Sequence, residues 1–325
     1  MSEPSVSAVI VNWNHGHLLP GCLGPLLAQG RTGTDITVVD NGSQDGSPQW
    51  LPQRYPEVHL WAMPENRGFS AALNSGIGHT TGELVLSLNP DVTVAPGFVA
   101  HLVEAMGQDA RIGIGAPKLL QADDPARLDS TGLFIDRRRR PFDRGQGELD
   151  RGQYDTQLSV FGACGAAALY RRAMLEDLAV DGEVLDEGFF AYYEDADLSW
   201  RAQLRGWRCV YVPQAVATHA RGRGDTLRQK GRAAKGSRGP RLALRNRYLM
   251  ALKNDRTAYF LADLPLILAA ELPRLGYAAV TRPAVLLGLL DLARALPGGW
   301  RKRRLVRGRR SVDDAALRRW FLGRA

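Results

Sequence analysis

The sequence predicts an α/β fold, with a mostly parallel sheet that carries helices on both faces and a helical C-terminal extension. Apolar runs alternate with helical patterns between residues 7 and 89, and these runs are short and almost continuously apolar. Such runs are typical of strands that are covered on both faces. The extension is predicted by the long apolar runs of residues 258–297. A content of 45% hydrophobic and 23% charged residues is that of a globular chain.

Four short runs predict the strands of the sheet, because β-branched and other apolar residues dominate them. They are residues 7–13 (SAVIVNW), 36–40 (ITVVD), 58–62 (VHLWA) and 84–89 (LVLSLN). Residues 69–79 predict a helix, since Phe69, Leu73 and Ile77 recur at helical spacing. The alternation of strand and helix favours parallel pairing, and ligands of parallel sheets gather at the carboxyl ends of the strands.

Polar residues follow each predicted strand. They are Asn12 and Asn14, residues 40–47 (DNGSQDGS), residues 65–68 (ENRG) and residues 89–91 (NPD). Each cluster alone is compatible with a turn or a helix cap, whereas four at one edge of a sheet predict a binding site. Asp40 is suited to accept a hydrogen bond from a base or ribose, and the alternative is an Asx-turn. Arg67 is suited to meet a base or phosphate, and the alternative is a solvated cation.

Asp91 has the most specific setting of these polar residues. Pro90 stiffens the chain and removes a backbone donor, so the carboxylate is held at the strand end in a fixed direction. Hard divalent cations take oxygen ligands and complete their shell with substrate phosphates. The motif therefore predicts a cation that bridges a diphosphate.

A second constellation lies in residues 185–220, where Glu194, Asp195 and Asp197 follow the run FFAYY. Acidic residues at a helix start are explained by capping. The aromatic run, however, predicts burial of one carboxylate, which would raise its pKa toward the range of a general base. His219 follows a predicted strand at residues 209–212 and stands either as a ligand or as an ordinary surface or core histidine.

Charge is distributed unevenly along the chain. Residues 1–220 carry 17 Lys/Arg and 27 Asp/Glu, whereas residues 221–325 carry 25 and 7. A nucleic-acid-binding role is disfavoured because the basic segments lack interleaved aromatic residues. The three cysteines are Cys22, Cys164 and Cys209, and their number and spacing fit neither a disulfide framework nor a zinc site. We therefore expect a reducing compartment and, from the opening residues, no secretory signal.

Two further segments have alternative interpretations. Residues 135–155 form a charged loop in which Arg137–Arg140 either meets the phosphate of a lipid-linked acceptor or is simply solvated. Residues 221–247 are basic and predict a mobile loop that closes over the site. The runs in 258–297 are interrupted by prolines and charges and fall short of the ~20 apolar residues needed for a membrane span. They predict helices in the membrane interface, a packed helical subdomain or a dimer interface.

Taken together, VIVNWN, VVDNGSQDGS, NRGFSAALNSGI, LSLNPDV, FFAYYEDADLSWRAQLRGW and THARG resemble the family 2 glycosyltransferases, especially their bacterial rhamnosyltransferase-like branch. The resemblance covers roughly residues 5–225 in order. It implies a GT-A fold, a nucleotide-diphosphate sugar donor, Mg²⁺ or Mn²⁺ and inversion at the anomeric carbon. One departure is Asn89, which stands where the family's Asp-x-Asp motif has its first acid.

The resemblance also assigns roles to residues. It implies Asp195 as the catalytic base and Asp91 and His219 as metal ligands. We expect Asn12, Asp40, Arg67, Asn74 and Asn89 to contact the donor. The expected domains are a glycosyltransferase domain at residues 1–225 and a basic helical region at residues 226–325.

The predicted function is transfer of a sugar, with rhamnose as the candidate, from a dTDP- or UDP-linked donor to a cell-envelope glycan or lipid-linked acceptor. The expected location is cytoplasmic, on the inner face of the membrane through an anionic lipid surface. The alternatives are a non-catalytic sugar-nucleotide-binding protein and a nucleotidyltransferase. The second is disfavoured because residues 12–21 (NWNHGHLLPG) contain no Lys or Arg for a triphosphate.

Overall fold

The computed structural model describes residues 3–30, 33–221 and 238–322. Its strands are β1 Val6–Asn12, β2 Thr34–Asn41, β3 His59–Met63, β4 Leu84–Leu88, β5 Val92–Val94, β6 Ile112–Gln121, β7 Leu128–Ser130, β8 Leu133–Ile135, β9 Pro141–Asp143, β10 Ala167–Arg171 and β11 Arg208–His219. Its helices are α1 Leu19–Leu27, α2 Ser47–Arg54, α3 Phe69–Gly78, α4 Phe98–Gly107, α5 Arg172–Leu178, α6 Glu194–Leu204, α8 Arg238–Asn254, α9 Thr257–Thr281, α10 Leu287–Gly308 and α11 Asp314–Phe321, with 3₁₀ turns η1 Glu187–Phe189 and η3 Pro283–Leu286. The predicted domain boundary at residue 225 and residues 222–237 of the predicted mobile loop lie outside the described residues, while residues 238–247 of that loop are wrong as a loop because they form the start of α8.

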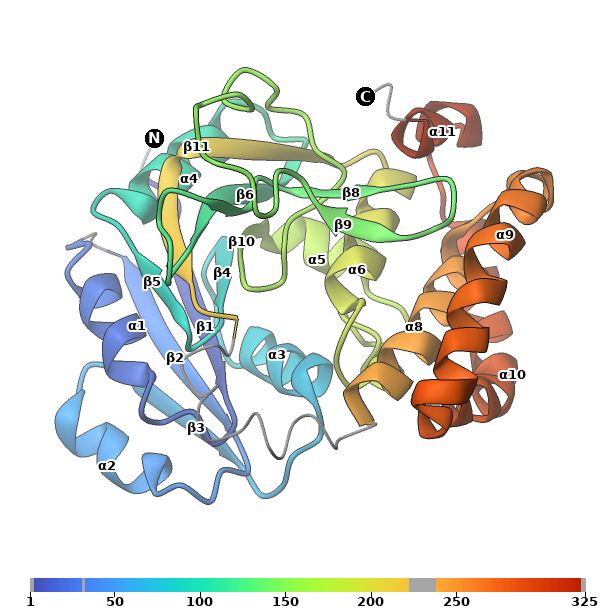
Figure 1. The fold of residues 1–325 in the computed structure, drawn as a ribbon. Coiled ribbons are helices and arrows are strands. Elements are labelled where there is room, and N and C mark those ends of the chain that lie inside the picture. The colour runs from blue at the N-terminus through green and yellow to red at the C-terminus, as the bar shows by residue number, and fades with distance from the viewer. Residues whose placement is uncertain (1–2, 31–32, 222–237, 323–325) are drawn as a thin grey trace.

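The central sheet has the order β3-β2-β1-β4-β10-β6-β11-β5, with β7 paired to β6 (Figure 1). The predicted strands β1 to β4 pair in parallel, as expected. The other half is mixed, because β10 runs antiparallel to both β4 and β6. The α/β class is therefore confirmed, while the antiparallel insertion depends on the long excursion between β6 and β10, which no local pattern reveals.

Two hydrophobic cores cover the two faces of the sheet. On β1, Ala8 and Ile10 pack in one core with α1, α2 and α4, whereas Val9 and Val11 pack in the other with α3, α5 and α6. This alternation follows from the two-residue period of a strand. The expectation that all four strands are covered on both faces is wrong for β3, which lies at the sheet edge with exposed residues His59, Trp61 and Ala62.

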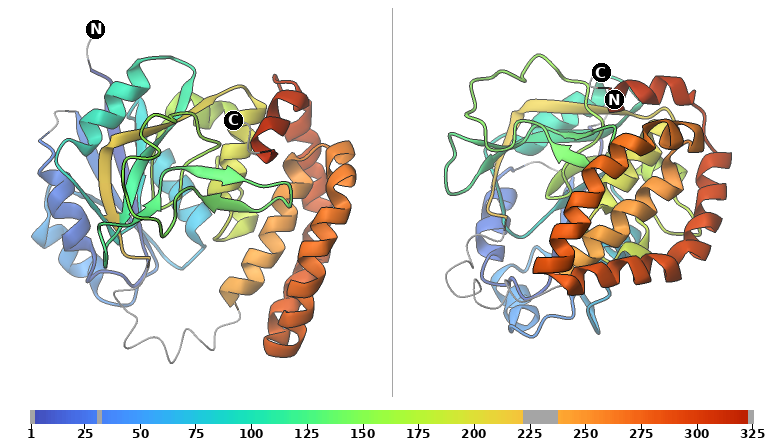
Figure 2. Two further views of the ribbon diagram at one scale, coloured as in Figure 1. Left: turned by 45° about the horizontal axis from the view of Figure 1, so that its top comes forward. Right: turned by 45° about the vertical axis from the view of Figure 1, so that its right-hand side comes forward.

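A third core joins the C-terminal helices to the rest of the molecule. Trp200 on α6 and Phe161 pack with Leu249 and Met250 of α8 and with residues of α10 and α11. Figure 2 shows α8, α9 and α10 as a layer along one side of the sheet domain. The interpretation of this region as a packed helical subdomain is therefore confirmed for its inner face. Among the described residues, no helix combines the length and apolar character that crossing a membrane requires.

Two of the charged residues inside the apolar runs, Asp263 and Glu271, are explained by buried ion pairs. Asp263 of α9 pairs with Arg139 at 2.7 Å, and Arg139 also contacts Asp255 at 2.7 Å. Further along α9, Glu271 pairs with Arg247 of α8. These pairs fix α9 to the core, and the helix continues for 25 residues through two prolines that the sequence predicts as interruptions.

Candidate active site

A cleft of about 630 Å³ opens at the carboxyl ends of β1 and β4. Its wall is formed by the segment after β4, the segment that precedes α6 and the first turn of α8. Of the predicted site residues, Asn89, Asp91, Asp195 and His219 line this cleft. The edge of the sheet that the sequence singled out is thus where the cavity lies.

Asp91 and His219 are brought together by the sheet. Strand β5 directly follows Asp91 and pairs antiparallel with β11, which sets His219 opposite Val92. The backbone N–H of Ala220 donates to the carbonyl of Asp91 at 3.1 Å. As a result, His219 Nε2 lies 3.5 Å from Asp91 Oδ1. The histidine is the last residue of β11, a longer strand than the predicted residues 209–212.

Asp129 orients this histidine and carries no motif in the sequence. Its Oδ2 accepts from His219 Nδ1 at 2.8 Å, and its Oδ1 accepts from Arg221 Nε at 2.6 Å. Burial opposes the charge of the imidazole, but Asp129 and Asp91 outweigh it and raise the pKa of His219 to about 9. Burial likewise opposes the charge of Asp129, and bonds from His219 and Arg221 hold its pKa below the usual range. The Nε2 atom is therefore held toward Asp91.

This arrangement fits a divalent cation that binds together with a diphosphate. A ligating histidine is ordinarily fixed through its other ring nitrogen by a carboxylate, as Asp129 fixes His219. Among the described residues, no group of three or more His, Cys, Asp and Glu side chains is arranged to hold a metal by itself. Asp91 and His219 would supply two ligands, and phosphate oxygens and water would fill the remaining positions.

Asp195 lies in the first turn of α6 and faces the same cleft. Its Oδ2 accepts from the backbone N–H of Gly165 at 2.8 Å. Burial raises the pKa of Asp195, although the bonds from Gly165 and Ala196 act in the opposite direction. A Cβ atom at position 165 would lie 3.2 Å from both Cβ and Oδ2 of Asp195, so the close approach favours glycine.

The loop that delivers Asp195 has a strained backbone. Phe190, Tyr192 and Tyr193 have φ values of 66°, 74° and 71°, in the left-handed region that side chains disfavour. Asn246 of α8 stabilises this strained loop, because its amide nitrogen lies 2.8–2.9 Å from the carbonyl oxygens of Phe189, Ala191 and Tyr192. Sequence reasoning missed Asn246, since an asparagine inside a helix gives no local sign of such contacts.

The three acids of the segment EDAD have different roles. Asp197 points away from the cleft and is fully buried, where it accepts from Arg201 at 3.0 Å, Lys253 at 3.0 Å and Asn254 at 2.8 Å. Asp197 therefore ties α6 to α8. Glu194 lines the cleft, and its Oε2 is buried with no hydrogen-bond partner among the described residues.

Glu194 makes stability depend on pH. Burial and then the charge of Asp195 raise its pKa from 4.5 to about 8. Between these values the folded state binds more protons than the unfolded state, so the free energy of unfolding falls as pH rises. We expect the free energy of unfolding of Glu194→Gln to rise relative to that of the unsubstituted protein as pH increases from 5 to 8, by on the order of 1.4 kcal/mol for each pH unit. Urea unfolding at both pH values measures this. The exposed Glu176→Gln serves as control, and an equal pH response in the two variants would contradict the burial of Glu194.

The other predicted donor contacts do not line the cleft. Asn12 is buried and donates to Asp40 Oδ1 at 3.0 Å and Ser47 Oγ at 2.9 Å. Asp40 also accepts from the N–H of Ser43 at 2.9 Å, which is the turn geometry considered as its alternative. These bonds hold the loop after β2.

Arg67 and Asn74 both contact the segment before α6. Arg67 is exposed and pairs with Glu187 at 3.2 Å. The amide nitrogen of Asn74 donates to the carbonyl of Leu185 at 2.8 Å, and its oxygen accepts from the N–H of Leu185 at 2.8 Å. Asn74 thus clamps α3 to this segment.

Asn41 and Trp13 line the cleft and were not singled out individually from the sequence. Asn41 accepts from the N–H of Arg67 at 3.0 Å and so fixes the turn after β3. Trp13 is 47% exposed, which is unusual for an indole and suited to stacking against a flat ligand. Asn41 belongs to the DNG stretch, so this motif could have identified it as a site residue. The exposure of Trp13 to the cleft, in contrast, depends on the fold.

Comparisons with known proteins identify the family of the chain. Residues 7–179 match the family described as "Glycosyl transferase family 2". The chain is 28% identical over 246 residues to the "N-acetylglucosaminyl-diphospho-decaprenol L-rhamnosyltransferase" of Mycobacterium tuberculosis, covering 65% of this chain and 74% of the relative. It is 30% identical over 251 residues to an "N-acetylglucosaminyltransferase" of Mesorhizobium japonicum, covering 71% of this chain and 55% of the relative.

Solved structures show the same fold. A mannosyltransferase from Pyrobaculum calidifontis, in complex with GDP-Man and Mn²⁺, aligns with a TM-score of 0.57 at 19% identity over 94% of this chain and 86% of that one. A fragment of the S. aureus protein TarS, in complex with UDP, aligns with a TM-score of 0.57 at 16% identity over 98% of this chain and 90% of that one. The GT-A type of fold is confirmed by these neighbours. The chain belongs to glycosyl transferase family 2 and resembles the rhamnosyltransferase branch within it.

Proposed function

We propose that the protein transfers rhamnose from a nucleotide-diphosphate donor to a hydroxyl of a lipid-linked acceptor, with inversion at the anomeric carbon. The observation that carries the proposal is the sharing of one cleft by Asp195, with its raised pKa, and the Asp91–His219 pair. Family membership supports the glycosyl transfer. The name of the mycobacterial relative supports the sugar and the class of acceptor.

In this proposal Asp195 is the general base. Its carboxylate takes the proton from the acceptor hydroxyl as the hydroxyl oxygen attacks the anomeric carbon, and the bond from that carbon to the diphosphate breaks. The N–H of Gly165 bonds Oδ2 at 2.8 Å and the N–H of Ala196 bonds Oδ1 at 2.7 Å, so both oxygens are held in a fixed direction and each keeps a lone pair for the proton of the acceptor. Burial raises the proton affinity of the carboxylate, which suits a base that works near neutral pH.

Asp91 and His219 form the donor side of the site. A divalent cation held by these residues, either Mg²⁺ or Mn²⁺, would neutralise charge on the departing diphosphate. Asn89 faces the cleft with an uncharged amide and is assigned to hydroxyls of the donor. Asp40, Asn12, Arg67 and Asn74 are assigned to the nucleotide side, where they hold the loops that a base would contact.

Asp129 provides a test of the donor side. We expect Asp129→Asn to weaken Mn²⁺-dependent binding of the nucleotide by about 10–100-fold, because the carboxylate that orients His219 loses its charge. Calorimetric titration with UDP and with dTDP, each with and without Mn²⁺, measures this. Asp124→Asn is the control, since the Asp124 side chain is half-exposed and pairs with Arg127 in its own turn. Unchanged Mn²⁺-dependent binding in Asp129→Asn would remove Asp129 from the site.

A membrane surface is proposed as the place where the acceptor is met, on the cytoplasmic side. The outward surface of α9 and α10 exposes a set of large apolar side chains. They are Leu261, Leu266, Leu268, Leu272, Tyr277, Val280, Leu289, Leu290, Leu296 and Trp300. The excess of Lys and Arg in residues 221–325 adds attraction to anionic headgroups. These features support a peripheral attachment.

The function is tested with a panel of dTDP- and UDP-sugars, Mg²⁺ or Mn²⁺, and an N-acetylglucosaminyl-diphospho-lipid acceptor. We expect turnover of dTDP-rhamnose, with a product whose anomeric configuration by NMR is opposite to that of the donor. Retained configuration would overturn the single displacement. Donor binding without transfer to the lipid acceptor would instead favour a sugar-nucleotide-binding protein.

A further inference from the structure

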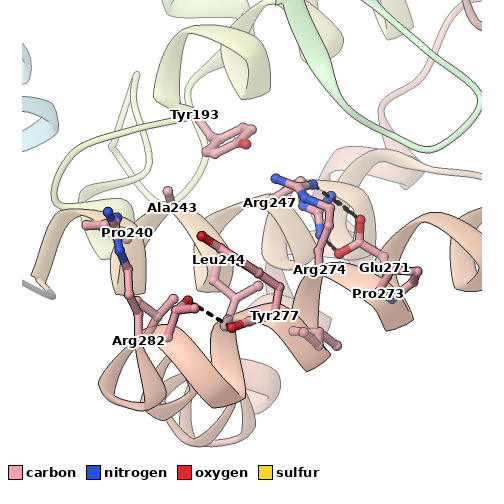
Figure 3. A pocket seen from close by; sticks show the side chains of 14 residues that line it. Tyr193, Pro240, Ala243, Leu244, Arg247, Glu271, Pro273, Arg274, Tyr277 and Arg282 are labelled. Carbon is pink, nitrogen blue, oxygen red and sulfur yellow. Dashed lines mark hydrogen bonds and ion pairs between the residues drawn. The ribbon is translucent and has the colours of Figure 1, made fainter.

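A second cleft, of about 600 Å³, lies between α8, α9 and η3 (Figure 3). One wall is the first half of α8, from Pro240 to Arg247, and the other is α9 from Glu271 onward. None of the predicted catalytic, metal-binding or donor-binding residues lines it. Its chemistry is therefore not explained by the donor site.

Positive charge dominates this second cleft. Arg247, Arg274 and Arg282 line it, and Glu271 is the one acidic side chain among the described residues of its lining. Figure 3 shows Arg247 and Arg274 beside the Glu271 carboxylate. Arg247 forms a buried pair with Glu271, so this carboxylate is already engaged. An anion that enters the cleft would meet the remaining cations.

Two of these arginines are available for a ligand. Arg274 is 51% exposed, and its ion pair with Glu271 is long, at 3.6 Å. Arg282 is exposed, and its side chain has no hydrogen-bond or ion-pair partner within the described part of the chain. A guanidinium group binds phosphate through several parallel N–H donors, which makes arginine the usual residue for phosphate recognition.

Arg140 adds a fourth positive charge nearby. Its pKa is lowered, first by burial and then by the charges of Arg274 and Arg247. In contrast, Arg137 and Arg139 of the same run are paired with Asp263, and Arg138 is paired with Asp136. Arg140 does not line the second cleft, and within the run that the sequence assigned to an acceptor phosphate it is the residue on which the charges of Arg274 and Arg247 act.

The remaining lining of the cleft is mostly apolar. It includes Leu244, Leu275, Tyr277, Ala278 and Val285. Tyr277 is 71% exposed, so the cleft is continuous with the exposed apolar surface of α9. A cationic centre beside an apolar, outward-facing wall suits a ligand that has a phosphate group attached to a hydrocarbon chain.

The second cleft borders the donor cleft. Tyr193 lines both of them, two residues before Asp195. In the first turn of α8, Gly239 lines the donor cleft, whereas the next residue, Pro240, lines the second cleft. A ligand anchored in the second cleft would therefore reach the base by passing Tyr193.

We infer that the second cleft binds the phosphate and the first part of the hydrocarbon chain of the lipid-linked acceptor, and that its sugar passes Tyr193 to reach Asp195. This assignment rests on the proposed function. It commits to the acceptor lipid, because a ligand that must reach Asp195 needs a sugar beyond its phosphate. Ordinary anionic phospholipid is the alternative source of the same chemistry, and the experiment separates the two.

Binding of farnesyl diphosphate to the full chain, measured by calorimetry in EDTA, tests the inference. EDTA removes any divalent cation that would recruit a diphosphate to the donor site. We expect farnesyl diphosphate to bind at least about tenfold more tightly than farnesol or inorganic diphosphate, and Arg274→Ala/Arg282→Ala to weaken it by about tenfold or more. The matched control is Arg294→Ala/Arg304→Ala, which removes the same charge from α10 outside the cleft, and it should bind within about twofold of the unsubstituted protein.

The outcomes are distinct. Equal binding by the two double variants would overturn the inference, because a general loss of charge would then explain the effect. Co-sedimentation with phosphatidylglycerol vesicles gives a second readout. Loss of vesicle binding in the Arg274/Arg282 variant alone, with farnesyl diphosphate binding retained, would also overturn it and identify bulk phospholipid as the ligand.

A single substitution in the apolar wall of the second cleft gives a further test. Ala278→Trp would fill the cleft without changing charge, and we expect it to weaken farnesyl diphosphate binding by about tenfold while inorganic diphosphate binding stays as it was. Unchanged affinity for farnesyl diphosphate would contradict the position of the chain. Titration of the unsubstituted protein with UDP and Mn²⁺ keeps the two proposals separate, since failure to bind nucleotide would overturn the proposed function and not the lipid-phosphate site.

Discussion

Asp195→Asn is expected to lower kcat for sugar transfer by about 10²–10⁴-fold, the usual contribution of a positioned general base. The amide keeps the shape of the carboxyl group and can still accept the bond from Gly165, but it cannot take a proton from the acceptor hydroxyl. KM for the donor should change little, because Asp91 and His219 remain in place on the donor side. Initial rates at saturating donor and acceptor measure the effect.

The control for this prediction is Asp181→Asn, the same chemical change at a residue that pairs with exposed Arg301. It should keep full activity. Asp181→Asn should unfold at the same urea concentration as the unsubstituted protein, and Asp195→Asn at the same or a higher one, because burial raises the pKa of Asp195 and the amide carries no charge to bury. Activity within about threefold of normal in Asp195→Asn would exclude Asp195 as the base, and a lowered unfolding midpoint would mean that the residue acts through the fold.

Asp197→Ala is expected to have the opposite profile, with a loss of about 3–5 kcal/mol in the free energy of unfolding. Asp197 is fully buried, and its carboxylate accepts from Arg201, Lys253 and Asn254. Removal of the carboxylate leaves Arg201 and Lys253 in the interior with fewer anionic partners. Asp186 still contacts Lys253 at 2.6 Å, so a part of the network survives.

Urea unfolding at pH 7 measures this loss. Glu176→Ala, which removes an exposed acid from neighbouring α5, should change stability by less than about 1 kcal/mol. If Asp197→Ala unfolded with nearly the same midpoint as Glu176→Ala, the bonds between α6 and α8 would contribute little. The two predictions together assign different roles to acids only two positions apart.

The sequence predicted much of the fold because strand and helix periods are local properties. The runs that became β1 to β4 and α3 have apolar residues at strand or helix spacing, and the parallel order follows from their alternation. The antiparallel β10 and the edge position of β3 were not predictable in this way. Both depend on which strand becomes a neighbour, and that is decided by packing over long chain separations.

The site was predictable where a residue type sits at a special local position. Asp91 follows a proline at a strand end, and Asp195 begins a helix after an aromatic run, so both could be named from the sequence. Asp129 and Asn246 could not, because each acts on a residue more than 50 positions away through contacts that only folding creates. The donor contact of Asn74 stays a prediction, since in the structure its amide binds the backbone of Leu185 outside the cleft.

The sequence by itself determined the fold class, the edge of the sheet where the cleft opens and the glycosyltransferase family of this protein. Those features follow from local periodicity and from short motifs whose chemistry is carried by single residues. Only the tertiary structure decided how the acids of EDAD differ and which arginines of residues 137–140 form ion pairs with Asp263 and Asp136. The physical reason is that burial and charge pairing depend on which distant side chains meet, and these set both pKa and stability.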